Sequence, residues 1–146
     1  MISKKVDISP KNDNYARLAE YIADAGHEGE KSLMRWCAGC LGDDDYQNGI
    51  AEAMDVQAIN VRTTKNKTYH LVVFMAIEER FTAALGYTEH QRHCGVHKNT
   101  ANLHMHIAYN MIHPEKHTRH EPFRDYWKRD TLCRELEQEY GLVVDN

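Results

Sequence analysis

The feature that most constrains the fold is the alternating stretch LHMHIAYNMI, residues 103–112. Alternate side chains of a β-strand lie on the same face, so this stretch predicts a strand with one apolar and one polar face. The apolar face comprises Met105, Ile107 and Tyr109. The polar face carries His104 and His106, and such a two-sided strand belongs in a sheet that packs on a core.

Other segments of the chain supply partners for this strand. RHCGVH, residues 92–97, lies just before it across the short polar sequence KNTAN, which is typical of a β-hairpin. ISKKVDI (2–8) and TYHLVVF (68–74) predict two more strands, the second rich in β-branched and aromatic residues. The sequence therefore predicts an antiparallel sheet built around the hairpin.

Helical patterns separate and follow the strands. They span residues 9–29, 42–60, 75–86 and 121–141. Ser9, Asn12 or Asp13 is expected to cap the first helix, and Gly86 to end the third. The mixed order of elements predicts an α+β fold in one domain, residues 1–146, with an antiparallel central sheet and helices packed on one side of it.

Composition limits the class of protein. The chain has 146 residues, 42% of them hydrophobic, which suffices for one core. It has no apolar run of about 18 residues and no secretory signal, so we expect a cytoplasmic protein without a membrane span. Its net charge is −4. Any nucleic acid must therefore be bound by a local basic face or through a metal ion.

The four cysteines include one C-x-x-C pair, Cys37 and Cys40. A structural zinc site normally needs a second pair of ligands, and Cys94 and Cys133 are isolated in the sequence. Reduced, semi-buried thiols of a cytoplasmic protein are therefore favoured over a zinc site.

The histidines of the hairpin form a candidate metal site. His104 and His106 are expected about 6–7 Å apart on one strand face, at about 3.3 Å per residue. The hairpin would bring His97 back beside them, so that three neutral imidazoles bind one divalent ion and leave positions open for a substrate. The alternative is a polar sheet face that carries histidines by chance, and the third histidine favours the metal site.

The motif HKNTANLHMHIAYNMIHP, residues 97–114, resembles the third motif of P-type plasmid mobilisation relaxases, in the HUH endonuclease superfamily. KTYHLVV, LGYTEHQR, HEPFRDYW and LEQEYGLVVDN resemble the same domain, so the likeness covers Lys67 to the end and, more loosely, the first 30 residues. It implies an HUH, ferredoxin-like relaxase fold in a bacterial cytoplasmic protein. It also implies a further C-terminal region, which such proteins usually carry.

The resemblance implies an activity and its partners. Such enzymes nick and rejoin one strand of DNA at a plasmid transfer origin through a covalent 5′-phosphotyrosyl intermediate, which initiates conjugative transfer. The expected cofactor is a divalent metal, Mg²⁺ or Mn²⁺ before Zn²⁺, bound by His97, His104 and His106. The expected partners are single-stranded origin DNA and the accessory DNA-binding and coupling proteins of a conjugation system.

Two tyrosines of the first helix compete for the role of nucleophile. At 100° per residue, Tyr15 lies in the middle of the apolar stripe and Tyr21 on its edge. A nucleophile needs a hydroxyl that reaches out of the core, and the resemblance aligns EYIAD with the reactive position. Both arguments favour Tyr21, while the alternative is that both tyrosines only pack.

The chain departs from the family pattern at two places. Asn99 and Ala101 stand where the third motif has acidic residues. Asn99, with Asn110 further along, is expected to hydrogen-bond the metal-binding imidazoles, but an amide cannot accept a proton as a base. The second departure is the junction Phe74–Met75, where strand and helix patterns meet without a loop; we expect that a loop is missing from the sequence there.

Several cations and aromatic rings are candidates for DNA contacts. The predicted phosphate-binding residues are Arg62, Lys65, Lys67, Arg92, His120 and Arg124. Trp36, Tyr87 and Trp127 are candidates for stacking on bases, but for Trp127 a place in the core of the last helix is favoured.

Two other functions remain open at this point. A rolling-circle replication initiator shares the His-x-His and the tyrosine, but there the tyrosine usually follows the histidines in sequence, and here it precedes them. A catalytically weakened metal- or DNA-binding module is made plausible by Asn99 and Ala101.

Overall fold

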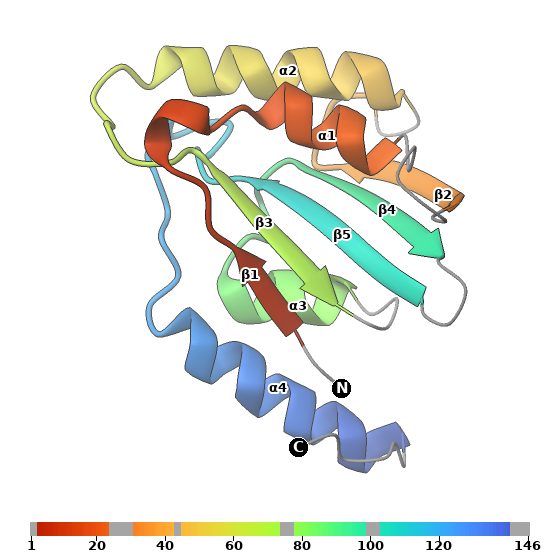
Figure 1. Cartoon of the computed structure of the whole chain (residues 1–146). Helices are drawn as coiled ribbons and strands as arrows, with labels where there is room; N and C mark the ends of the chain where they lie inside the picture. The colour runs from red at the N-terminus through yellow and green to blue at the C-terminus, as the bar shows by residue number, and fades with distance from the viewer. Residues whose placement is uncertain (1–2, 24–30, 43–44, 74–77, 99–102, 141–146) are drawn as a thin grey trace.

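The computed structural model describes residues 3–23, 31–42, 45–73, 78–98 and 103–140. They form a five-stranded antiparallel sheet in the order β1-β3-β5-β4-β2 (Figure 1). The strands are β1 (Ser3–Val6), β2 (Lys31–Ala38), β3 (Thr68–Val73), β4 (Arg92–Lys98) and β5 (Leu103–Asn110). The helices are the short 3₁₀ turn η1 (Pro10–Asn12), α1 (Tyr15–Ala23), α2 (Tyr46–Ile59), α3 (Glu78–Leu85) and α4 (Asp125–Tyr140).

The α+β class is confirmed, but helices cover both faces of the sheet rather than one. Figure 1 shows α1 and α2 on one face and α3 and α4 on the other. The reason lies in the strands, because β3 and β4 bury side chains of both faces along most of their length. Each face then needs its own apolar cover.

The predicted hairpin forms with the expected two-sided strand. In its register His97 lies opposite His104, and Gly95 lies opposite His106. The apolar face of β5 is fully buried in the core beneath α3 and α4, as predicted. The histidine face therefore turns toward α1 and α2.

Strand β2, Lys31–Ala38, was not predicted. β2 is the edge strand beside β4, and its apolar residues do not alternate cleanly. Leu33 and Met34 are 54% and 57% exposed, so neither side chain indicates which face of the strand packs on the core. The turn at Gly39, with φ of +78°, marks where this strand ends.

The predicted caps of the first helix are wrong. Ser9 and Asn12 flank or belong to η1, and the carboxylate of Asp13 accepts a hydrogen bond from the backbone of Lys67. Helix α1 is instead capped by Asn14, whose side chain accepts from the backbone N–H of Arg17 at 3.0 Å. The turn η1 and this cap fix where α1 begins relative to the sheet.

A glycine lets α1 lie close against the histidine face. A Cβ placed on Gly95 of β4 would come within 2.6 Å of the Ile22 side chain and 2.8 Å of its carbonyl oxygen. Any side chain there would displace the helix. The close packing brings the C-terminal half of α1 down onto the histidines of the hairpin.

Candidate active site

Tyr21 extends from α1 over the histidine face. Its ring centre lies 6.0 Å from that of His97 and 5.7 Å from that of His106, both edge-on. The Tyr21 side chain is half-buried and lines a pocket of about 580 Å³ between α1 and the sheet. The structure thus brings together the tyrosine and the histidines that the sequence singled out.

The walls of this pocket carry positive charge and hydrogen-bonding groups. Arg17 lies one helical turn before Tyr21 on the same side of α1, and Lys4 projects from β1. Further polar residues of its lining are Asn12, Asn14, His70, His104 and His106. Cations beside a candidate nucleophile suit a phosphodiester, whose oxygens are negatively charged.

Three histidines converge from β4 and β5. The rings of His97 and His106 have centres 4.5 Å apart, and His104 lies directly opposite His97 in the register. His97 is completely buried, and its Nε2 lies 2.6 Å from the Ile22 carbonyl, which can only accept. Helix α1 therefore holds the His97 ring as well as presenting Tyr21.

A fourth histidine, His70 of β3, was not predicted. Its Nε2 lies 3.0 Å from Nδ1 of His106, and both side chains are buried. Burial, with a smaller contribution from the charge of His97, lowers the pKa of His70 to about 4. His70 was missed because its place beside β5 depends on the long-range pairing of β3 with β5; its only sequence signal is an imidazole inside the buried strand TYHLVV.

The donor set fits a divalent ion in its chemistry. Imidazole nitrogens bind first-row divalent metals, and a metal on His106 would have to use Nε2, because Nδ1 is engaged with His70. His97 would have to use Nδ1 while its Nε2 bonds to Ile22. Within the described residues no three histidine, cysteine or carboxylate side chains are already grouped as metal ligands.

Tyr15, the competing tyrosine, is buried in the core. Its hydroxyl lies 2.6 Å from Nδ1 of His93 and 3.3 Å from the carbonyl oxygen of Ala108. Burial raises the pKa of Tyr15 well above its usual value. The burial pattern expected from the helical wheel is therefore observed, with Tyr15 inside and Tyr21 at the edge.

The stability of the domain is expected to fall at acidic pH because of His93. Burial lowers the pKa of His93 to about 4, opposed by its hydrogen bond to the Tyr46 carbonyl. The unfolded chain, with a histidine pKa near 6.5, binds a proton that the folded chain does not. The free energy of unfolding is therefore expected to fall as pH drops from about 6.5 to about 4, by up to about 3 kcal/mol for this group.

Urea unfolding across this pH range checks the prediction on the wild type and on His93→Gln, which has no titrating ring. We expect a shallower pH dependence in the variant. Equal slopes would contradict the prediction, and the NMR titration of the His93 ring in the wild type gives the same answer if the variant does not fold.

The predicted DNA-binding residues fall into two groups. Lys67, Arg92 and His120 are engaged within the fold. Lys67 Nζ donates to two carbonyls at the end of α2, Arg92 forms an ion pair with Glu78 at 2.8 Å, and His120 Nε2 lies 2.9 Å from the Leu85 carbonyl. Arg62, Lys65 and Arg124 are exposed.

The aromatic side chains of Trp127 and Tyr87 do not lie where they were predicted. Trp127 is not in the core but 62% exposed, because the helix buries other positions instead, among them Leu132 and Leu136. Tyr87 is fully buried, so it offers no surface for stacking. Trp36 is half-buried and packs against the core of the opposite sheet face.

The remaining expected site residues lie apart from the cluster or outside the described chain. Asn110, at the far end of β5, bonds through its amide to Gln57 and Gln91. Asn99, Ala101 and the Phe74–Met75 junction lie outside the described residues. Cys37 and Cys40 are buried, and their thiols lie beside backbone carbonyls, those of Gly42 and Asp45 for Cys37 and of Ala38 and Gly49 for Cys40.

The fold and this site define a class: an α+β domain with a tyrosine above a histidine-lined, cationic pocket. The chain belongs to the relaxase family, since residues 21–142 match the MobA/VirD2-like relaxase nuclease domain. The family match confirms the resemblance drawn from the motif at residues 97–114 and makes this chain a nuclease domain. Relaxase domains are generally metal-dependent.

Two relatives are proteins of Escherichia coli, each called Protein TraI. Each is 40% identical to this chain over 159 positions, which include the whole chain. The chain spans only 21% and 22% of their lengths, and the aligned region is longer than its 146 residues. No solved structure matches the chain. Among the described helices, none has both the length and the apolar character needed to cross a bilayer.

Proposed function

We propose that this domain nicks and rejoins one strand of DNA at a plasmid transfer origin and thereby initiates conjugative transfer, with Tyr21 as nucleophile. The observation that carries the proposal is the position of Tyr21, whose ring lies within 6.0 Å of the His97 and His106 rings at a pocket lined by cations. The relaxase family and the relatives named TraI support the same activity.

The proposed reaction is a transesterification at phosphorus. The Tyr21 oxygen attacks the scissile phosphate, loses its proton, and forms a bond to the 5′ phosphate, while the 3′ oxygen leaves as a hydroxyl. Lys4 and Arg17 bind the phosphate oxygens on the pocket walls. A phenolate is a reasonable leaving group, so a free 3′ hydroxyl can reverse the step and rejoin the strand.

We assign the divalent metal to His97, His104 and His106, with Mg²⁺ or Mn²⁺ before Zn²⁺. When bound, it neutralises charge that develops on the phosphate oxygens. His70 positions His106, because its Nε2 can accept from Nδ1–H and so fix the tautomer that presents Nε2 to the ion. Asn99 replaces an acidic residue of the family motif, so another group must take the Tyr21 proton.

The proposed setting is the bacterial cytoplasm, where accessory DNA-binding and coupling proteins of a conjugation system assemble with the nicked strand. A rolling-circle initiator is less well supported, since Tyr21 precedes the histidines in sequence and the matching family is that of relaxases.

The experiment that tests the proposal incubates the domain with single-stranded oligonucleotides tiled across the transfer origin of a plasmid that encodes this chain. We expect a covalent protein–DNA adduct on a denaturing gel with Mn²⁺ or Mg²⁺, none with EDTA, and release of a fragment with a free 3′ hydroxyl. Absence of an adduct on every tile would overturn the proposal.

A further inference from the structure

An exposed aromatic cluster lies at the beginning of α4, on the sheet face opposite the catalytic pocket. Phe123, Tyr126 and Trp127 are 71%, 73% and 62% exposed. Three large aromatic side chains within five residues are unusual on the surface of a soluble domain and mark an interaction site. The fold does not require this exposure, since α4 packs through other positions.

The charges beside this cluster that form no ion pair in the described chain are of one sign. Arg124 and Lys128 form no ion pair in the described chain. The nearby carboxylates are already paired: Glu121 with Arg119, Asp125 with Arg129 and Asp130 with Arg134. The uncompensated charge around the aromatic rings is therefore positive, which favours a polyanion over an apolar partner.

The backbone at Arg124 adds an independent observation. Its φ is +52°, a left-handed conformation that a residue with a side chain rarely adopts. This conformation immediately precedes α4, and the guanidinium lies 5.3 Å from the centre of the Phe123 ring. Local backbone strain is concentrated at binding sites, where the surrounding structure maintains it.

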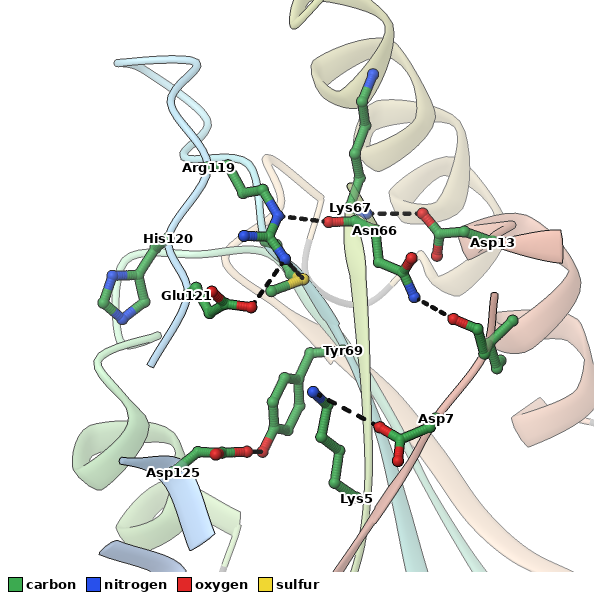
Figure 2. A network of polar contacts seen from close by, with 12 residues as sticks. Lys5, Asp7, Asp13, Asn66, Lys67, Tyr69, Arg119, His120, Glu121 and Asp125 are labelled. Carbon is green, nitrogen blue, oxygen red and sulfur yellow. Dashed lines mark hydrogen bonds and ion pairs between the residues drawn. The ribbon is translucent and has the colours of Figure 1, made fainter. Parts of the chain in front are cut away.

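A hollow adjoins the catalytic pocket and extends to Tyr69, which contacts the first turn of α4. It has a volume of about 320 Å³ and shares Val6 and Ile8 of the β1 edge with that pocket. Figure 2 shows its wall at Tyr69, whose hydroxyl donates to Asp125 at the first turn of α4 at 2.7 Å. Lys5, Lys65 and Arg119 line the hollow; Lys5 pairs with Asp7 and Arg119 with Glu121, so Lys65 carries the excess positive charge of this lining.

We propose that this surface, formed by Phe123, Arg124, Tyr126, Trp127 and Lys128, binds single-stranded DNA by stacking bases on its aromatic rings. The strand runs from the catalytic pocket across the β1 edge and the hollow to α4. The identity of the ligand rests on the proposed function, but the surface is separate from the reacting groups. Stacking of this kind tolerates any base sequence, so the surface adds affinity and orientation rather than sequence choice.

Binding is measured without metal, so that no nicking occurs, from the fluorescence anisotropy of a labelled oligothymidylate. We expect Tyr126→Ala and Trp127→Ala each to raise Kd about fivefold or more, and Arg124→Ala to reduce the slope of log K against log salt by about 1. Tyr140→Ala is the matched control, since Tyr140 is an aromatic residue of the same helix and 51% exposed. Ultraviolet cross-linking should attach thymine to residues 123–127.

Unchanged affinity in the alanine variants would overturn the proposal. So would a change in sedimentation with unchanged DNA affinity, because the surface would then be a contact between protein chains. Circular dichroism establishes that the variants fold. A chain that forms no covalent adduct, yet loses affinity in these variants, would refute the proposed function and leave the surface standing. Adduct formation combined with unchanged affinity would support the proposed function and refute the proposed DNA-binding surface.

Discussion

Tyr21→Phe is expected to abolish the covalent adduct with origin DNA while the protein still folds and binds DNA. A phenyl ring has no oxygen to attack phosphorus, and no neighbouring hydroxyl of α1 replaces it, because the Tyr15 hydroxyl is buried against His93. The loss should be complete on a denaturing gel rather than a change of a few fold. Oligonucleotide affinity, measured in EDTA, should stay within about twofold of the wild type.

Tyr15→Phe is the matched control on the same helix. It removes the hydrogen bonds to His93 and Ala108, so we expect a loss of about 1–3 kcal/mol in the free energy of unfolding, since Nδ1 of His93 loses its buried partner while Nε2 keeps the Tyr46 carbonyl. Its adduct should form as in the wild type at a temperature where it is folded. An adduct that still forms with Tyr21→Phe, or that is lost with Tyr15→Phe alone, would assign the nucleophile to Tyr15 and a packing role to Tyr21.

His70→Leu is expected to weaken metal binding about 10- to 100-fold, the usual effect of removing a group that orients a metal-binding histidine. Leucine leaves Nδ1 of His106 without its buried partner and removes the bond that fixes its tautomer. Calorimetric titration with Mn²⁺ in the absence of DNA measures this directly and does not depend on activity.

His70→Gln separates positioning from packing. A glutamine oxygen can accept from Nδ1–H of His106, so this variant should recover much of the affinity that leucine loses. His104→Ala, which removes a proposed ligand, gives the reference for a damaged site. Metal affinity in His70→Leu equal to that of the wild type, or equal losses with leucine and glutamine, would contradict the positioning role.

The parts of the fold that were predictable have local patterns. The alternation in residues 103–112 determines the two faces of β5, and the wheel of α1 separates a central Tyr15 from an edge Tyr21. The parts that were missed depend on distant partners. β2 has no clean alternation because it is an edge strand, and His70 meets His106 only through the pairing of β3 with β5.

The assignments of charged and aromatic side chains to DNA were the least predictable part of the site. Lys67 bonds to carbonyls at the end of α2, and Arg92 forms an ion pair with Glu78 of α3. Both contacts depend on where these helices lie. Lys4 and Arg17 line the pocket beside Tyr21, although nothing in their immediate sequence distinguishes them from other surface cations. Trp127 turns outward because α4 packs on the domain through other positions, among them Leu132, Cys133 and Leu136.

The close contact of Ile22 with Gly95 makes the proposed catalytic geometry a property of tertiary packing. Tyr21 and the histidines of the hairpin, His97, His104 and His106, belong to segments more than 70 residues apart, and no backbone ladder joins α1 to the sheet. A partly denatured state that keeps its helices and hairpin but loosens their packing would still give a native-like far-ultraviolet spectrum. In that state Tyr21, the proposed nucleophile, would already have moved away from the histidines. The yield of covalent adduct is therefore a more sensitive reporter of native packing than secondary-structure content.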